Sequence, residues 1–342
     1  MNGRRFFMDE GVGEQRAVVT LAGRPERLMI ARDTDLAVQG LGARVAARVR
    51  AIDRVQNIAF LDLGEGPDAA LNLTSDVGPV REGGWAEIEI RSEARAGKGA
   101  TARWVGPAEG PVRLLAGPPD LGQRLAVFAK SAAIASRIFA REVADQAQDQ
   151  LLETVFPLPG GGTIAVETTR ALVAIDVDLG SNNAGKRTTR VANLAALAEA
   201  ARVLRLKGLG GLVVIDLAGR GHDGAALLAA ARVAFGPDNP GVAFGPISRF
   251  GTLELTIPRR ARPTIEIIAG DHATTIVTQA MALIRALERE AAIDGGGRFE
   301  ALADGPVATA AAPYLKRLTE RFGARLSVRI AAGHPAFEVR AA

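Results

Sequence analysis

The fold is decided by a stretch that begins Ala171-Leu-Val-Ala-Ile-Asp-Val-Asp178 and ends Gly211-Leu-Val-Val-Ile-Asp216. Each of these short apolar runs finishes on an acid, and such an unbroken run is typical of a strand that is covered on both faces. The segment between the runs has helical spacing, so the pattern predicts a β-α-β unit. Crossovers of this kind are almost always right-handed and place the two strands parallel in one sheet. We therefore expect Asp176 and Asp216 to emerge at the same sheet edge, where open α/β sheets form their sites.

The composition indicates a globular protein of two or three domains. The chain has 342 residues, of which 48% are hydrophobic and 23% charged, and these values exclude a disordered class. It contains no Cys, so neither disulfides nor thiolate metal sites can form, and its three His cannot make a His-rich metal cage. Any metal must therefore be held by oxygen. The net charge is only +4, but Arg and Lys gather in clusters that suit either a polyanion partner or solvated helix faces.

No stretch has the features of a targeting or membrane segment. The first ten residues lack the apolar core of a signal peptide, and no apolar run approaches the roughly 20 residues of a membrane helix. We therefore expect a cytoplasmic protein with no membrane partner.

The first 156 residues predict three segments. Residues 1–39 alternate weakly, as a pair of strands does. Residues 40–104 carry five strand signals separated by Gly and Pro turns, namely Val45–Ile52, Asn57–Leu63, Ala69–Leu73, Trp85–Arg91 and Ala100–Trp104. This is the size of an OB-fold, a small barrel often used on single-stranded nucleic acid, although a generic small barrel fits equally well. Residues 105–156 predict a linker and then one long helix over Leu121–Leu152.

The remaining residues predict an α/β domain and a small α+β domain. Residues 157–268 contain the β-α-β unit, and we expect its helix to begin near Val191 under a cap from Thr188 or Thr189. Residues 269–342 predict a helix followed by a β-α-β-β pattern.

Two carboxylates at one sheet edge, with neither His nor Cys near them in sequence, suit Mg²⁺. This hard ion keeps several waters and typically takes one or two protein carboxylates. Beside basic clusters, the combination favours phosphodiester chemistry, in which the metal polarises the phosphate and activates water. The alternative is that Asp176 and Asp216 only cap loops or helices, and the spacing alone leaves both interpretations open.

The loop between the two runs suggests a second chemistry. Its sequence, Gly180-Ser-Asn-Asn-Ala-Gly-Lys186, nearly matches the phosphate-binding loop G-x-x-x-x-G-K-[ST] after a strand and before a helix. The strand that ends at Asp216 would then be the acid-bearing strand of a nucleotide hydrolase. The match fails at Arg187, where Ser or Thr should ligate Mg²⁺, and a chance match in a Gly/Asn loop is the alternative.

Longer collinear stretches resemble the ribonuclease E/G family of bacterial endoribonucleases. They are Asn193-Leu, Arg202-Val-Leu-Arg-Leu-Lys-Gly-Leu-Gly-Gly-Leu-Val-Val-Ile-Asp216, Ala174-Ile-Asp-Val177, Ile247-Ser-Arg-Phe-Gly-Thr-Leu-Glu-Leu255 and Pro157-Leu-Pro-Gly-Gly-Gly-Thr-Ile-Ala-Val166. The resemblance implies a mixed α/β and β multidomain protein. An OB-fold barrel would be inserted before a catalytic α/β domain like deoxyribonuclease I, and a small α+β domain would follow it. Residues 1–39 and 105–156 would be a reduced ribonuclease-H-like remnant.

The resemblance also implies the catalytic residues. Asp176 and Asp216 fall on the family's two Mg²⁺-binding catalytic aspartates. Asp178 stands where the family holds an Asn, so we expect it to assist them. Arg249 falls on a basic residue near the scissile phosphate.

The same resemblance implies RNA-binding residues in the barrel. Phe60 falls on a residue that stacks on RNA, and Lys98 falls on one that grips it. A π-face beside a cation is also what sequence-tolerant RNA binding needs on physical grounds.

The chain departs from the family pattern at several places. Ala70 stands where the barrel has a second exposed aromatic, and Ala195 stands where the helix has Glu. Without Cys, the zinc link between the family's subunits cannot form, so we expect no zinc and any homo-oligomer to assemble without it. The stretch between Trp104 and Pro157 leaves no room for a domain that senses a 5′-monophosphate.

We therefore predict a compact, Mg²⁺-dependent endoribonuclease that cleaves single-stranded RNA in RNA processing or decay. One alternative is a catalytically impaired RNA-binding relative, which the altered loop over residues 178–190 suggests. The other is a P-loop-like nucleotide hydrolase that binds its nucleotide through Lys186.

Overall fold

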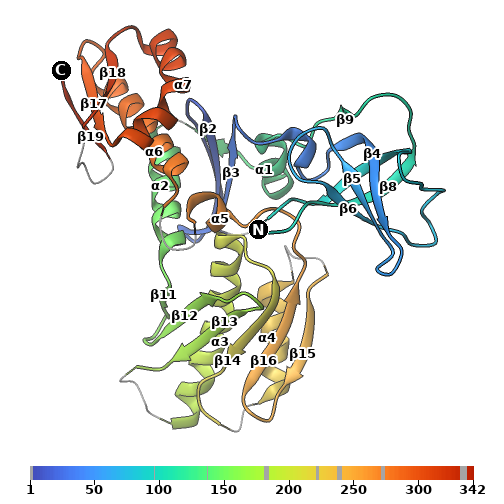
Figure 1. Ribbon diagram of the computed structural model, residues 1–342. Coiled ribbons are helices and arrows are strands. Elements are labelled where there is room, and N and C mark those ends of the chain that lie inside the picture. Colours follow the sequence, from blue (N-terminus) through green and yellow to red (C-terminus); the bar gives the residue numbers. More distant parts are fainter. Residues whose placement is uncertain are drawn as a thin grey trace.

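The computed structural model describes residues 3–95, 97–136, 138–180, 185–220, 223–236, 241–270, 274–331 and 337–342, without the side chains of residues 138 and 185–188. Within these ranges the strands form four sheets. Figure 1 shows the sheet of the N-terminal strands at the centre, with the barrel on one side of it and the C-terminal unit on the other. The α/β unit that carries the predicted acids lies below this central sheet.

Helices α1 (Leu121–Ala129) and α2 (Ile138–Leu152) pack on opposite faces of the central sheet. Its strands are β1 (Arg4–Glu10), β2 (Glu14–Leu21), β3 (Arg24–Arg32) and β10 (Ile134–Ala135). The strands lie in the order β10-β1-β2-β3, which includes the predicted strand pair. Alternation along β1 sends Phe6 into the core that contains Leu125 of α1, and Phe7 into the opposite core with Ala144 of α2.

The single helix predicted over Leu121–Leu152 is wrong. Asp120 begins α1 with a capping box, in which its carboxylate accepts the Gln123 N–H and the Gln123 side chain accepts the Asp120 N–H. Lys130, at φ 54°, ends the helix, and the chain adds β10 to the sheet edge before α2 begins. The apolar spacing is continuous across the break because both helices bury an apolar side, on opposite faces of one sheet.

The segment predicted as five short strands closes into a barrel. Its strands are β4 (Arg44–Asp53), β5 (Ile58–Asp62), β6 (Ala69–Asn72), β7 (Trp85–Ser92) and β8 (Thr101–Pro107). They pair around a ring in the order β4-β5-β6-β8-β7-β4, and the pair β6–β8 is parallel. The linker prediction missed β9 (Arg113–Ala116), which pairs with β4.

The α/β unit contains the predicted β-α-β arrangement. Its elements are β11 (Val155–Pro157), β12 (Thr163–Thr168), β13 (Val173–Asp178), α3 (Gly185–Lys207), β14 (Gly211–Asp216), α4 (Gly224–Phe235), β15 (Ala243–Ile247) and β16 (Thr252–Ile257). The sheet order is β11-β12-β13-β14-β16-β15, and β13 and β14 are parallel as predicted. The helix α3 begins at Gly185, earlier than the predicted start near Val191, so a cap from Thr188 or Thr189 is wrong.

The expectation that both faces of β13 and β14 are covered is wrong. Ile175 and Ile215 pack in the core that contains α3 and α4. The alternate positions face the other way, where Leu212 is exposed and Ala174 and Val214 are half-buried. The two runs look continuous because apolar residues also occupy this open face. The acids therefore lie on a sheet surface that is accessible to a large substrate.

Buried ion pairs fix α3 to the central sheet. Glu199 of α3 accepts hydrogen bonds from Arg202 and from Arg24 of β3, and Arg205 pairs with Glu26 of β3 at 2.7 Å. Burial opposes ionisation of Glu199, but the hydrogen bonds from Arg202 and Arg24 outweigh it and hold the pKa of Glu199 below its ordinary value. These contacts hold the half of α3 that lies away from the acids.

The C-terminal unit confirms the predicted helix and β-α-β-β pattern. The elements after β16 are α5 (Thr264–Ile268), α6 (Ile276–Ile293), β17 (Phe299–Ala303), α7 (Gly305–Phe322), β18 (Leu326–Ile330) and β19 (Phe337–Ala341). The sheet order is β18-β17-β19, and α6 and α7 pack in its core. Among the helices of the described ranges, none combines the length and apolar character that crossing a membrane requires.

Candidate active site

The structure brings Asp176 and Asp216 together at one sheet edge. They form the final register pair of β13 and β14, in a ladder that starts with Val173 opposite Val213. Opposed residues of neighbouring strands point to the same face, and neighbouring strands lie about 4.8 Å apart. Both carboxylates are exposed on the open face. The predicted meeting of the two acids at one edge is confirmed.

The two carboxylates suit a hard cation in number and in kind. Mg²⁺ prefers oxygen ligands and commonly takes one or two protein carboxylates beside several waters. Within the part of the chain that the structure describes, no three His, Cys, Asp or Glu side chains gather as a metal site. A magnesium site here would therefore use Asp176 and Asp216 and fill its other positions with water or substrate oxygens.

Asp178 lies at the same edge and has a structural contact of its own. It stands two residues beyond Asp176 on the same face of β13, opposite Thr163 of β12. Its Oδ1 accepts the Gly180 N–H at 2.8 Å, a bond that shapes the start of the loop. Asp178 therefore supports the loop after the acid strand.

The loop itself is described only in part. Residues 181–184 and the side chains of Lys186 and Arg187 lie outside the described residues. The near-match to a phosphate-binding loop falls on these residues, so the nucleotide-hydrolase alternative stays a prediction.

Arg249 lies at the acid edge, in the predicted turn between β15 and β16. The strand β16 begins at Thr252, which stands directly opposite Asp216. The Ser248 hydroxyl is 2.8 Å from the Thr252 hydroxyl, and it accepts the Phe250 N–H at 3.2 Å, which makes the turn compact. The guanidinium of Arg249 lies 4.6 Å from the centre of the Phe250 ring, and Phe250 as a residue is 77% exposed. A cation and an open aromatic face thus stand beside Asp216.

Phe60 and Lys98 lie on the outside of the barrel. Phe60, on β5, is 39% exposed and stands opposite Ala70 of β6. Lys98 is exposed in a tight turn just before β8, where its backbone exchanges hydrogen bonds with Arg95 at 2.8 and 3.0 Å. A side chain at Gly99 would collide with the Asp68 carbonyl, so this turn needs glycine to pack against the start of β6.

The structure does not bring the barrel residues to the acids. The barrel contacts the segment that follows β16, at the end of this strand that lies away from Asp216. There Glu93 accepts the Arg262 N–H at 2.7 Å. Along β16, Thr252 stands opposite Asp216 and Ile257 stands opposite Gly211. Five steps of about 3.4 Å separate these two rows by roughly 17 Å. In Figure 1 the barrel lies beside the upper end of the α/β unit.

Sequence comparison shows which proteins the segment that holds the acids is similar to. Residues 118–260 match the sequence model of the Ribonuclease E/G family. We call residues 118–260 the ribonuclease E/G segment, because they are similar to that family. The chain is 30% identical over 152 residues to the chloroplastic ribonuclease E/G-like protein of Arabidopsis thaliana, a match that covers 41% of this chain and 15% of that protein. It is 38% identical over 107 residues to ribonuclease E of Escherichia coli (strain K12), which covers 30% of this chain and 10% of the relative.

A ribonuclease E of Buchnera aphidicola subsp. Acyrthosiphon pisum gives a similar match, 39% identical over 108 residues, 30% of this chain and 12% of the relative. The chain thus spans only a small part of the relatives it matches. The ribonuclease E/G segment contains Asp176, Asp178, Asp216 and Arg249, whereas the barrel lies outside it.

Asn193 is a residue of the ribonuclease E/G segment that we did not predict for the site. It lies within α3 and is fully buried. Its side-chain amide donates to the Ala218 carbonyl and accepts the Ala218 N–H, both at 3.0 Å. The signal in sequence is a polar residue next to the apolar stripe of a helix, where Asn is disfavoured unless it has partners.

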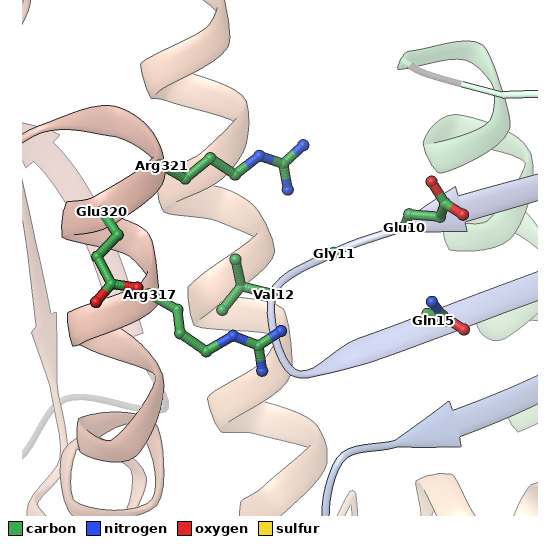
Figure 2. A pocket seen from close by; sticks show the side chains of 7 residues that line it. All are labelled: Glu10, Gly11, Val12, Gln15, Arg317, Glu320 and Arg321. Atoms are coloured by element: carbon green, nitrogen blue, oxygen red, sulfur yellow. The ribbon is translucent and has the colours of Figure 1, made fainter.

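The hollow in Figure 2 belongs to another part of the molecule. Its lining comes from the turn between β1 and β2 and from α7, and comprises Glu10, Gly11, Val12, Gln15, Arg317, Glu320 and Arg321. Beneath it, the buried Glu288 accepts hydrogen bonds from the Val12 N–H at 3.0 Å and from Arg321 at 3.2 Å. The hollow lies where the C-terminal unit contacts the central sheet, away from Asp176 and Asp216.

Proposed function

We propose that the chain is an Mg²⁺-dependent endoribonuclease that cleaves single-stranded RNA in RNA processing or decay. The observation that carries the proposal is the register pair of Asp176 and Asp216 on an open sheet face, inside a ribonuclease E/G segment. The relative from Escherichia coli is named ribonuclease E and that from Arabidopsis thaliana ribonuclease E/G-like protein, which supports the reaction class.

Each residue at the edge would have a defined task. Asp176 and Asp216 would hold the metal through their carboxylate oxygens, while Asp178 keeps the adjoining loop in place through Gly180. A bound Mg²⁺ would neutralise charge on the scissile phosphate and lower the pKa of an attacking water. Arg249, whose planar guanidinium suits phosphate oxygens, would hold the phosphate at the same edge.

Phe250 gives Arg249 a neighbour that suits a nucleobase. The guanidinium covers one face of the ring, and most of Phe250 is exposed. A base that stacked on the free face would lie beside the phosphate that Arg249 binds. Such stacking is worth about 1–3 kcal/mol per base and tolerates any base, so this contact would favour unpaired RNA without selecting a sequence.

The barrel would hold RNA away from the cut. Its ring order supports assignment to the OB-fold, a five-stranded barrel used on single-stranded nucleic acids. Phe60 would stack on a base and Lys98 would bind a phosphate. Since Ala70 stands opposite Phe60, the stacking surface is small, and we expect affinity to depend mainly on phosphate contacts and therefore on salt.

The decisive experiment incubates the full chain with a labelled single-stranded RNA of about 20 nucleotides. At about 3.4 Å for each stacked nucleotide, this RNA is long enough to reach from the acid edge to the barrel. We expect discrete products with Mg²⁺ and none with EDTA. Asp176→Asn and Asp216→Asn should each lower the rate by about a hundredfold or more, since even outer-shell partners of a metal cost about 10- to 100-fold. No cleavage by the wild type with Mg²⁺, or an Asp216→Asn variant as fast as the wild type, would sink the proposal.

Glu167→Gln is the matched control for these variants. Glu167 is an exposed carboxylate on the same open face, on β12, and it stands opposite Ala174 rather than an acid. Its removal changes the charge of the sheet by the same amount and should leave the rate unchanged.

A second candidate is an RNA-binding relative without catalysis. It is favoured by Asp178, which stands where the family resemblance expects Asn and whose carboxylate bonds to the Gly180 N–H. Its signature would be salt-sensitive RNA binding that survives loss of Asp176 and Asp216, with no cleavage products.

A further inference from the structure

We propose that Asn193 is a positioning residue that holds Asp216 and the Arg249 turn in one arrangement. The inference rests on the proposed nuclease function, because it concerns the geometry of that site. Asn193 itself lies in α3, behind the sheet, and its bonds go to the backbone that directly follows Asp216.

The side chain of Asn193 forms hydrogen bonds with both backbone polar groups of Ala218. Its Nδ2 donates to the Ala218 carbonyl and its Oδ1 accepts the Ala218 N–H, each at 3.0 Å. An amide is suited to this double contact, because it carries a donor and an acceptor side by side. Asn is a poor residue for the interior of a helix, so its burial at this point is explained by these two bonds.

The hairpin of β15 and β16 binds Leu217, the residue before Ala218, through a backbone hydrogen bond. The Leu217 N–H donates to the Gly251 carbonyl at 3.2 Å, and Gly251 belongs to the turn that carries Arg249. Leu217 is also buried in the core under the sheet. Gly251 has φ 93°, a conformation that favours glycine and that brings the chain back from the turn into β16.

These contacts link α3 to the acid edge in one continuous path. The path runs from Asn193 through Ala218 and Leu217 to Gly251, and Asp216 is the residue next to Leu217. The ladder between β13 and β14 ends at Asp216, so the bonds that follow it keep the strand end from fraying. The ion pairs of Glu199 with Arg24 and Arg202 lie in the other half of α3 and are not part of this path.

Loss of the two hydrogen bonds from Asn193 should misplace Asp216 without removing any group that touches RNA. A mutation far from the reacting atoms that misplaces a catalytic group by about 1 Å can cost about a hundredfold in rate. We therefore expect Asn193→Ala to lower kcat by about tenfold to a hundredfold, with KM for RNA changed less than about twofold.

Two further measurements report on position rather than on activity. Amide hydrogen exchange, followed by NMR, should be at least about tenfold faster at Ala218 in Asn193→Ala than in the wild type. The affinity for Mn²⁺, measured by electron paramagnetic resonance as a stand-in for Mg²⁺, should fall severalfold. Asn193→Asp keeps the acceptor for the Ala218 N–H, so it should protect that amide better than Asn193→Ala, and it serves if the alanine variant does not fold.

Glu199→Gln is the control for a general effect on α3. Glu199 is buried in the same helix and bonds to Arg24 and Arg202, but not to the residues after Asp216. This variant should keep the wild-type kcat, Mn²⁺ affinity and Ala218 exchange at a temperature at which it is folded.

Two results would overturn the role of Asn193. One is wild-type exchange at Ala218 together with wild-type Mn²⁺ affinity in the Asn193 variants. The other is an equal loss in Glu199→Gln, because the effect would then be one of helix stability. Failure of the proposed function looks different, since wild-type protein with Mg²⁺ would cut no RNA. In that case the exchange and Mn²⁺ measurements still decide whether Asn193 positions the edge.

Discussion

Glu93 of the barrel accepts the backbone N–H of Arg262 at 2.7 Å, and the same carboxylate accepts the Leu41 N–H at 3.1 Å. Glu93 also donates its own N–H to the Arg260 carbonyl at 2.7 Å. These bonds fasten the barrel beyond the end of β16 that lies away from Asp216. RNA that is held by the barrel and cut at the acids must therefore bridge about 17 Å or more.

The barrel should help only with RNA that is long enough. At about 3.4 Å for each stacked nucleotide, the bridge needs at least about five nucleotides. Lys98→Ala should raise KM for a 20-nucleotide RNA about three- to tenfold, the loss of one exposed phosphate contact, and leave KM for a four-nucleotide RNA unchanged. Steady-state kinetics on both lengths makes the test, with Lys316→Ala, an exposed lysine of α7, as the charge-matched control. An equal effect of Lys98→Ala on both lengths would contradict the bridge.

Phe250 should contribute through its ring and not through protein stability. Phe250→Ala should lower kcat/KM about 5- to 150-fold, the equivalent of one lost base stack, and Phe250→Tyr should retain most of the activity. Because Phe250 is 77% exposed, the melting temperature should change little in either variant. A tyrosine variant as slow as the alanine variant would argue against stacking.

The acid edge could be predicted because its signals are local. The apolar runs before Asp176 and Asp216 mark two strands, and the rule for β-α-β crossovers makes those strands parallel. Collinear resemblance then pointed to Arg249, whose turn lies between two strands that the sequence also marks. These inferences need only neighbouring residues and the general topology of sheets.

The features that were missed depend on tertiary context. Lys130 ends α1 with a positive φ, which a lysine does not signal in sequence. Leu212 and Val214 are apolar although they face the open side, so hydrophobicity could not separate the covered face from the open one. The bonds of Asn193 to Ala218 join residues 25 positions apart and follow only from the packing of α3 on the sheet.

Glu288 should be one of the main supports of the joint between the central sheet and the C-terminal unit. Its buried carboxylate accepts the Val12 N–H at 3.0 Å, Arg141 at 2.7 Å and Arg321 at 3.2 Å. Glu288→Gln removes a buried charge that faces two guanidinium groups, which should lower the free energy of unfolding by about 3 kcal/mol in urea denaturation. The control is Glu300→Gln, whose carboxylate pairs with arginines at the surface and should matter little. Equal losses in the two variants would contradict a special role for the joint.

Lys207 should make stability increase with pH in the alkaline range. Burial lowers its pKa to about 8, although Glu153 opposes the shift. The ammonium donates to the carbonyls of Leu151 and Glu153, both at 2.6 Å, at the end of α2. The folded pKa lies below the unfolded value of about 10.4, so between about pH 8 and pH 10.4 the unfolded chain binds more protons, and the free energy of unfolding rises with pH. The rise contributed by this group should be on the order of 3 kcal/mol. Urea denaturation from pH 7 to pH 10 measures it, and Lys207→Met should lose this rise whatever its absolute stability. If wild type and Lys207→Met respond to pH in parallel, the lysine is not held in the low-pKa environment that the fold gives it.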